Sequence, residues 1–212
     1  MDAAIRQIDL PVGECVRRGW DLAIKNLGPL LGYTIIVLAI SIALGLIPIL
    51  GAIATIVISP ALSAGYFIYT RKSLRGEATV FGDFFGGFDY LGQLFLYGLV
   101  GGLLVAIGLV LCIIPGLYLA IGYMFASFLI VAKRMDFWAA METSRKVVTA
   151  NIGSVIVLIL LQIAINILGL LACGVGLIIS IPVSYCAGVV AYQMLFEEEV
   201  PPIPAAGPVT IG

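Results

Sequence analysis

Two amide side chains, Gln162 and Asn166, are the polar groups best placed for joint chemistry inside a long apolar run. They are four residues apart, so on a helix they share one face. There they could line a cavity, or they could form hydrogen bonds to a neighbouring helix. Tyr123 and Tyr185 fall deep in other apolar runs, where a buried hydroxyl needs a hydrogen-bond partner. These four residues are the expected polar lining of the interior, and both readings of the amides stay open.

Nucleophilic catalysis has little support, because the chain contains no histidine to act as a general base. Ser144 and Lys146 are two residues apart, and side chains at that spacing do not face each other on a helix. We therefore predict no catalytic residue, no cofactor-binding residue and no enzymatic activity.

The four cysteines are scattered and form no CxxC motif, which disfavours metal and redox roles. We predict that they are small packing residues and that the chain has no metal site. Cys112 and Cys173 both lie near predicted turns on the same side of the membrane. A disulfide between them is compatible with that placement, but no other feature supports it.

The solvent for most of this chain must be lipid. Of its 212 residues, 62% are hydrophobic and 11% are charged, and the mean hydropathy is +1.17. Soluble domains have about 45–50% apolar and about 25% charged residues. The net charge of −1 argues against nucleic-acid binding, which needs a basic surface.

Six uncharged apolar runs indicate an all-α integral membrane fold. We expect six transmembrane helices paired as three hairpins, each preceded by an amphipathic helix at the membrane interface. The expected spans are Leu27–Ile47, Ile49–Thr70, Leu91–Ile114, Leu117–Ala132, Ile152–Ala172 and Val175–Phe196. The expected amphipathic segments are Met1–Lys25, Gly76–Tyr90 and Met135–Ala150, the second weakened by its glycines.

The chain is expected to form one membrane domain over residues 1–196. The tail, residues 197–212, is acidic and then rich in proline and glycine, so we expect it to be disordered. Residues 1–26 carry charges throughout and have no apolar core, so no cleavable signal peptide is expected there.

Proline and glycine mark a tight turn in each hairpin, and the expected turn residues are Pro48, Gly51, Pro115, Gly116 and Gly174. An Asn- or Tyr-apolar-Gly triplet opens each hairpin. The glycines of these triplets are 64 and 61 residues apart, namely Gly28, Gly92 and Gly153. This spacing indicates a threefold internal repeat with units of about 12–75, 76–134 and 135–196. The alternative is that any protein with six spans and short hairpins shows similar spacing.

Small residues recur every four positions on several spans, as at Thr55, Ser59 and Ser63. Such stripes let helices approach closely, so we expect a packing role for them.

The distribution of charge predicts the topology. All eleven Lys and Arg residues lie in the N-terminal segment or in the connections 71–90 and 133–150. Cytoplasmic loops carry an excess of Lys and Arg, so these connections and both termini are predicted to be cytoplasmic. The expected location is the plasma (inner) membrane of a prokaryote. The spans contain no ionisable group of the kind that marks proton relays and ion paths.

The stretch Pro115-Gly116-Leu117-Tyr118, followed by Ala140, Ser144 and Asn151, resembles a group of prokaryotic multi-pass membrane proteins. The group includes the YciC-like proteins and the membrane domain fused to some glycerophosphodiester phosphodiesterases. Trp20 with Lys25-Asn26 is similar to the first interfacial segment of the same group. Members often have Glu where this chain has Ala139, and no soluble phosphodiesterase domain is visible. The resemblance implies a six-span membrane protein, sometimes with lipid-related partners.

We expect a non-enzymatic scaffold or accessory component of the membrane. The alternative is a protein that transports or binds a lipid or another apolar small molecule. The expected partners are the lipid bilayer and either a membrane protein or a lipid ligand, with no nucleic acid and no cofactor. The filling of the axis between the hairpins distinguishes these two functions. Side chains along the axis would favour a scaffold, and lipid along it would favour binding or transport.

Overall fold

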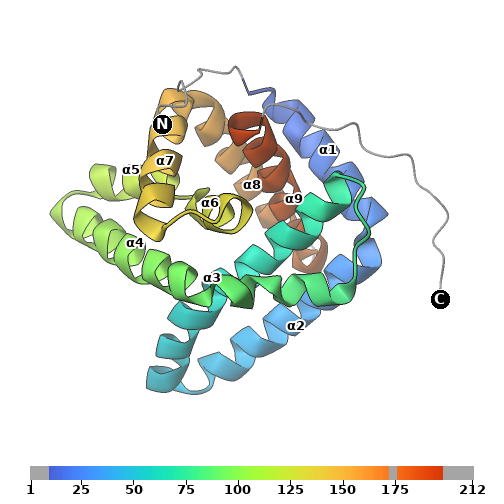
Figure 1. Ribbon diagram of the computed structural model, residues 1–212, viewed down its shortest axis with the longest axis horizontal. Coiled ribbons are helices and arrows are strands. Elements are labelled where there is room, and N and C mark those ends of the chain that lie inside the picture. Colours follow the sequence, from blue (N-terminus) through green and yellow to red (C-terminus); the bar gives the residue numbers. More distant parts are fainter. Residues whose placement is uncertain (1–9, 172–175, 198–212) are drawn as a thin grey trace.

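A computed structural model describes residues 10–171 and 176–197, and within these ranges the chain is helical and contains no strand (Figure 1). This confirms the predicted all-α class. The elements are α1 (Val12–Lys25), α2 (Leu27–Gly45), α3 (Pro48–Leu74), the 3-10 helix η1 (Phe81–Tyr90), α4 (Leu91–Leu111), α5 (Ile113–Gly122), α6 (Ala126–Lys133), α7 (Phe137–Ala150), α8 (Ile152–Leu171) and α9 (Leu177–Phe196).

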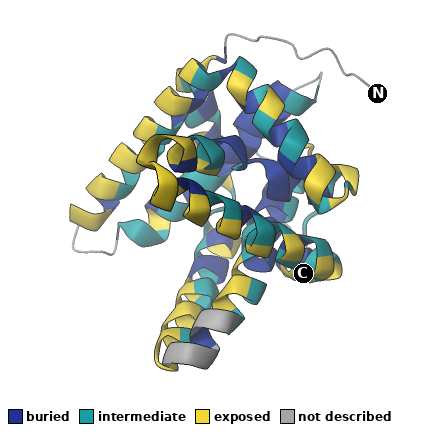
Figure 2. Ribbon diagram, turned by 90° about the vertical axis from the view of Figure 1, so that its left-hand side faces the viewer, coloured by how far each residue is buried: buried dark blue, intermediate teal, exposed yellow. Residues whose placement is uncertain are grey.

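The apolar helices form an outer and an inner layer. Only 17% of the most apolar stretch of α2, of α4 and of α8 is buried, whereas 61% of that of α9 is buried. Many large apolar residues are exposed, and the exposed fraction of Val110 on α4 is 88%. Figure 2 marks the exposed residues along the helices in yellow. Water would penalise such a surface heavily and lipid would not, so the protein is a membrane protein.

Within the described residues, five helical stretches are long and apolar enough to cross a membrane. They are Leu27–Gly45, Phe81–Leu111, Ile113–Lys133, Ile152–Leu171 and Leu177–Phe196. The predicted span Ile49–Thr70 corresponds to α3, which is not among the five.

The predicted span Leu117–Ala132 is divided in the structure. Helix α5 ends at Gly122 and α6 begins at Ala126, with a turn between them. The sequence gives little sign of this break, because the residues on both sides of it are apolar.

The second predicted turn lies slightly earlier than expected. Cys112 is the extended residue between α4 and α5, with φ −166° and ψ 136°. Pro115 and Gly116 lie inside the first turn of α5, where a missing proline N–H costs nothing because that group has no intrahelical partner. Pro48 likewise begins α3. Gly174 and the tail beyond Glu197 lie outside the described residues.

A glycine near each turn allows two helix backbones to touch. A Cβ atom added at Gly51 would overlap the carbonyl oxygen of Leu44. The same atom added at Gly116 would overlap the backbone of Leu109. In all three turns the glycine follows its backbone neighbour by seven residues, as in the pairs Leu44–Gly51, Leu109–Gly116 and Gly169–Gly176.

The three amphipathic elements pack in a cyclic order. Element η1 packs on α3, α7 packs on α5 and α6, and α1 packs on α9, so the first described helix lies against the last one described (Figure 1). Glycines make the closest approaches, since Gly19 meets Ala187 and Gly87 meets the carbonyl of Ala61. Of the three glycines that weakened the helix prediction for η1, Gly86 and Gly87 face α3 and allow this contact, whereas Gly82 has open space around it.

Three aromatic rings meet where the inner helices converge. The ring centroids of Phe67 on α3 and Phe128 on α6 are 4.4 Å apart. Tyr192 on α9 lies 5.1 Å from Phe67 and 5.9 Å from Phe128. Phe67 and Tyr192 are fully buried and Phe128 is 7% exposed, so side chains fill the centre at this level.

Candidate functional site: a lateral groove with a hydroxyl-lined end

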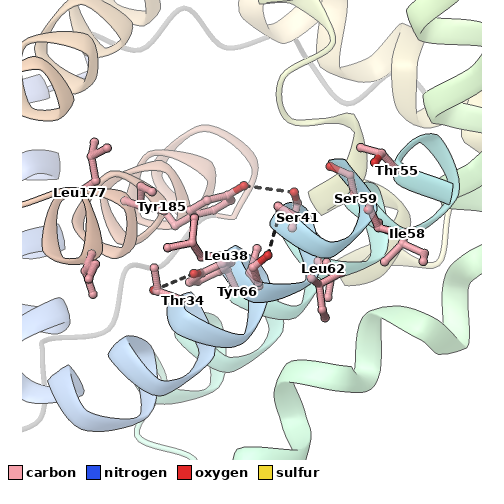
Figure 3. A pocket seen from close by; sticks show the side chains of 16 residues that line it. Thr34, Leu38, Ser41, Thr55, Ile58, Ser59, Leu62, Tyr66, Leu177 and Tyr185 are labelled. Atoms are coloured by element: carbon pink, nitrogen blue, oxygen red, sulfur yellow. Dashed lines mark hydrogen bonds between the residues drawn. The ribbon is translucent and has the colours of Figure 1, made fainter. Parts of the chain in front are cut away.

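A groove of about 480 Å³ lies between the α2–α3 pair and α9 (Figure 3). This volume lies in the range of about 300–1,000 Å³ that is typical of small-molecule sites. No charged residue is among the described residues that line the groove. Its walls are mainly apolar, with Val37, Leu38 and Ile40 on α2, Ile58 on α3 and Ile181 on α9.

Four hydroxyl groups gather at one end of the groove. The hydroxyl of Tyr66 donates to Oγ1 of Thr34 at 2.8 Å. Oγ of Ser63 and the hydroxyl of Tyr185 share a hydrogen bond of 3.1 Å. The two tyrosine rings are stacked with centroids 4.4 Å apart, which joins the two pairs (Figure 3). Helices α2, α3 and α9 each contribute to this polar end.

Three hydroxyl groups of the groove, including that of Thr34, donate to carbonyls of their own helices. Ser41 donates to the carbonyl of Val37 and Thr55 to that of Gly51, both at 2.8 Å. Thr34 donates to the carbonyl of Leu30 at 2.7 Å. Such bonds to the carbonyl four residues earlier satisfy a hydroxyl proton where no water is present.

Of the four residues predicted to line the interior, Tyr185 lies in this groove. Tyr123 lies at the α5–α6 break, where its backbone carbonyl accepts a hydrogen bond from the hydroxyl of Tyr97 at 3.1 Å. The structure therefore separates the two tyrosines.

Gln162 and Asn166 form a polar cluster with α9. Nε2 of Gln162 donates to the carbonyl of Ser184 at 3.1 Å. Nδ2 of Asn166 donates to Oγ of Ser184, and Oδ1 of Asn166 accepts from Ser180, both at 2.9 Å. These bonds join α8 to α9, and neither amide is among the residues that line the groove.

Sequence reasoning missed Thr34 and Tyr66 as site residues, and it assigned Thr55, Ser59 and Ser63 to helix packing. The feature of the sequence that could have indicated this site is the set of hydroxyl side chains that α2 and α3 carry in otherwise apolar runs. Their meeting with Tyr185 depends on how α2 and α3 pack against α9, which local sequence does not specify.

Ser144 has a structural position at the α5–α6 break. Its hydroxyl donates to the carbonyl of Gly122 at 2.6 Å, and its oxygen accepts from the backbone N–H of Phe125 at 3.3 Å. These groups are left without intrahelical partners where α5 ends and α6 begins. Lys146 instead lies 3.5 Å from Glu142, so the arrangement does not activate a serine nucleophile.

A second pocket, of about 490 Å³, lies near the Leu74 end of α3 and has charged walls. Lys72 pairs with Asp83 at 2.6 Å, and Glu197 accepts from Arg71 at 2.7 Å and Arg75 at 2.8 Å. Burial disfavours ionised Glu197, but the hydrogen bonds from the two arginines outweigh it and hold its pKa below the ordinary value. The basic side chains of this pocket are thus already matched by carboxylates.

No group of three metal-ligating side chains occurs in the part of the chain that the structure describes. Cys112 is exposed, whereas Cys15 and Cys186 are buried. Cys173 lies outside the described residues, so its pairing with Cys112 stays a prediction.

The chain is similar to uncharacterized mycobacterial proteins. Two from Mycobacterium tuberculosis strains and one from Mycobacterium bovis are each 30% identical to it over 169 residues. The alignment covers 78% of this chain and 52% of each relative, so the chain spans about half the length of the curated relatives it matches. No family model matches the chain, and no solved structure matches it.

Proposed function

We propose that this protein binds a lipid or another apolar small molecule within the membrane. The observation that carries the proposal is the uncharged groove of about 480 Å³ between the α2–α3 pair and α9. Its apolar walls suit a hydrocarbon, and its hydroxyl-lined end suits one polar group. The aromatic cluster of Phe67, Phe128 and Tyr192 fills the centre, so the proposed site is lateral rather than axial.

The proposed architecture has six spans, with α3 as the sixth, arranged as three hairpins of a threefold repeat. The seven-residue spacing of the turn glycines and the cyclic packing of α1, η1 and α7 support the repeat. Residues 54–70 of α3 carry no charge, which suits a membrane span. A relationship to YciC-like proteins remains part of this proposal.

We also propose an inner-membrane location with both termini cytoplasmic, on the basis of the positive-inside rule. Cys112 tests the orientation, because it is exposed between α4 and α5. In a Cys173→Ala background, a membrane-impermeant maleimide should label Cys112 in intact cells, with Lys146→Cys labelled only after the cells are opened. The reverse labelling pattern would show that the protein has the opposite orientation in the membrane.

The binding proposal is tested by filling the groove. Ser41 is an exposed residue of the groove wall, and its neighbour Ile42 is 59% exposed and does not line the groove. Native mass spectrometry of the purified protein should detect a retained apolar molecule. The Ser41→Phe variant should lose it and the Ile42→Phe variant should keep it. Equal retention by both variants contradicts the proposal.

The scaffold alternative makes a different prediction for the same preparation. A scaffold should purify with a stoichiometric partner protein, and Ser41→Phe should leave that partner bound.

A further inference from the structure

The hydrogen bonds of the groove specify the chemistry of its occupant. Each hydroxyl oxygen can accept two hydrogen bonds but can donate only one. The protons of Thr34, Ser41 and Thr55 go to backbone carbonyls. The proton of Tyr66 goes to Thr34. Most of the donor capacity of the groove is therefore already used.

The acceptor capacity is largely unused. Oη of Tyr66, Oγ of Ser41 and Oγ1 of Thr55 accept no hydrogen bond from the described residues. Two hydroxyl protons stay without an acceptor among those residues, that of Ser59 and one from the Ser63–Tyr185 pair. The groove is thus rich in acceptors and poor in donors.

We propose that the groove selects a neutral apolar alcohol, meaning a long-chain or polycyclic hydrocarbon with one hydroxyl group. This inference rests on the proposed function and specifies its ligand class. The hydroxyl of the ligand donates to an oxygen at the polar end, with Tyr66 as the best-placed acceptor. The hydrocarbon lies along Val37, Leu38 and Ile181.

The same reasoning disfavours other lipid-like molecules. An ether or ketone offers only acceptors, so it could meet one of the two free protons but would leave the free acceptor oxygens of the groove unused. An ionised fatty acid would place a carboxylate among the described lining residues, none of which carries a positive charge. An alcohol satisfies the unused acceptors without burying a charge.

The test compares three ligands that differ only in the polar end. Tritiated oleyl alcohol is bound to the purified full chain and displaced by unlabelled oleyl alcohol, by its methyl ether or by the parent hydrocarbon. A hydrogen bond in the membrane should make the alcohol about threefold to tenfold more effective than the ether. Equal displacement by all three ligands overturns the alcohol preference but leaves apolar binding intact. Absence of saturable binding overturns both.

Two tyrosine variants test which side chain accepts the hydrogen bond from the ligand. Tyr66→Phe removes the proposed acceptor while keeping the ring that stacks on Tyr185, and it should lower the alcohol-to-ether ratio. The control is Tyr33→Phe, because the hydroxyl of Tyr33 is also buried and donates to the carbonyl of Leu62, but Tyr33 itself is not among the residues that line the groove. It should keep the ratio. An unchanged ratio in Tyr66→Phe contradicts the assignment of the acceptor.

Discussion

Gly19 of α1 lies directly against Ala187 of α9, so that a Cβ atom added to the glycine would come within 2.6 Å of the Ala187 Cα. The two residues are far apart in the chain, and their contact joins the first and the last of the described helices. The backbone approach exists because glycine has no side chain. This contact closes the ring formed by the three amphipathic elements and the inner helices.

Substitution of Gly19 by alanine should therefore destabilise the protein. The new methyl group would meet backbone atoms that cannot rotate away, and overpacking of this kind costs about 1–3 kcal/mol. The free energy of unfolding can be measured by titration with a denaturing detergent in mixed micelles. Gly13→Ala is the control on the same helix, because its Cβ would meet nothing within 4 Å. Equal stability of the two variants would show that α1 is not held against α9.

The turn glycines make a second prediction. Gly116→Ala should destabilise the protein by about 1–3 kcal/mol, because the added Cβ would collide with the backbone of Leu109. Gly102 lies in the middle of α4 with open space around it. Gly102→Ala should leave stability unchanged or raise it by up to about 1 kcal/mol. The same unfolding titration measures the free energy of unfolding of both variants. If Gly102→Ala were the less stable of the two, the close backbone contact at the turn would be contradicted.

Ser144 should matter for stability rather than catalysis. Ser144→Ala leaves the buried carbonyl of Gly122 and the N–H of Phe125 without their side-chain partner, at a cost of about 1–3 kcal/mol. Thr143→Ala is the neighbouring control, and it should stay within about 0.5 kcal/mol of the wild type. Wild-type stability of the Ser144→Ala variant would mean that the α5–α6 break does not depend on this hydroxyl.

Glu197 makes the stability depend on pH. Its pKa in the folded protein is below the ordinary value of 4.5 because Arg75 and Arg71 stabilise the carboxylate against the cost of burial. A carboxyl group of this kind contributes stability above its ordinary pKa and loses it as the pH falls through the lowered one. Glu197→Gln should thus be less stable than the wild type at neutral pH, by about 1–3 kcal/mol.

The difference between wild type and Glu197→Gln should shrink as the pH falls below 4.5. Thermal unfolding in detergent across this pH range measures it. Glu77→Gln is the control, since Glu77 is exposed. A difference that stays constant with pH would contradict a role for the ionised carboxylate.

Hydropathy alone predicts much of the fold, because spans and amphipathic segments differ strongly in composition. The starts of α2, α4 and α8 fall at the predicted residues Leu27, Leu91 and Ile152. The break between α5 and α6 could not be predicted in the same way. It depends on Ser144, a residue of another helix, which supplies the hydrogen bonds that the turn requires.

The candidate site was less predictable than the fold. Spacing placed Gln162 and Asn166 on one face, but it could not decide which helix that face meets, and the amides bond to Ser184 on α9. Thr34 and Tyr66 come from different helices, and only their packing brings the hydroxyls to 2.8 Å. A groove formed by α2 and α3 together with α9, which is far from them in the chain, leaves no continuous signal in the sequence.

Photo-crosslinking with a diazirine-bearing fatty alcohol in phosphatidylcholine vesicles would locate a ligand bound in the groove. Mass spectrometry of the labelled peptides should find cross-links concentrated on the groove walls of α2, α3 and α9. The Ser41→Phe variant should lose this labelling, while Ile42→Phe should retain it. Labelling spread evenly over lipid-facing positions such as Val110 and Leu168, and unchanged by Ser41→Phe, would contradict ligand binding in the groove.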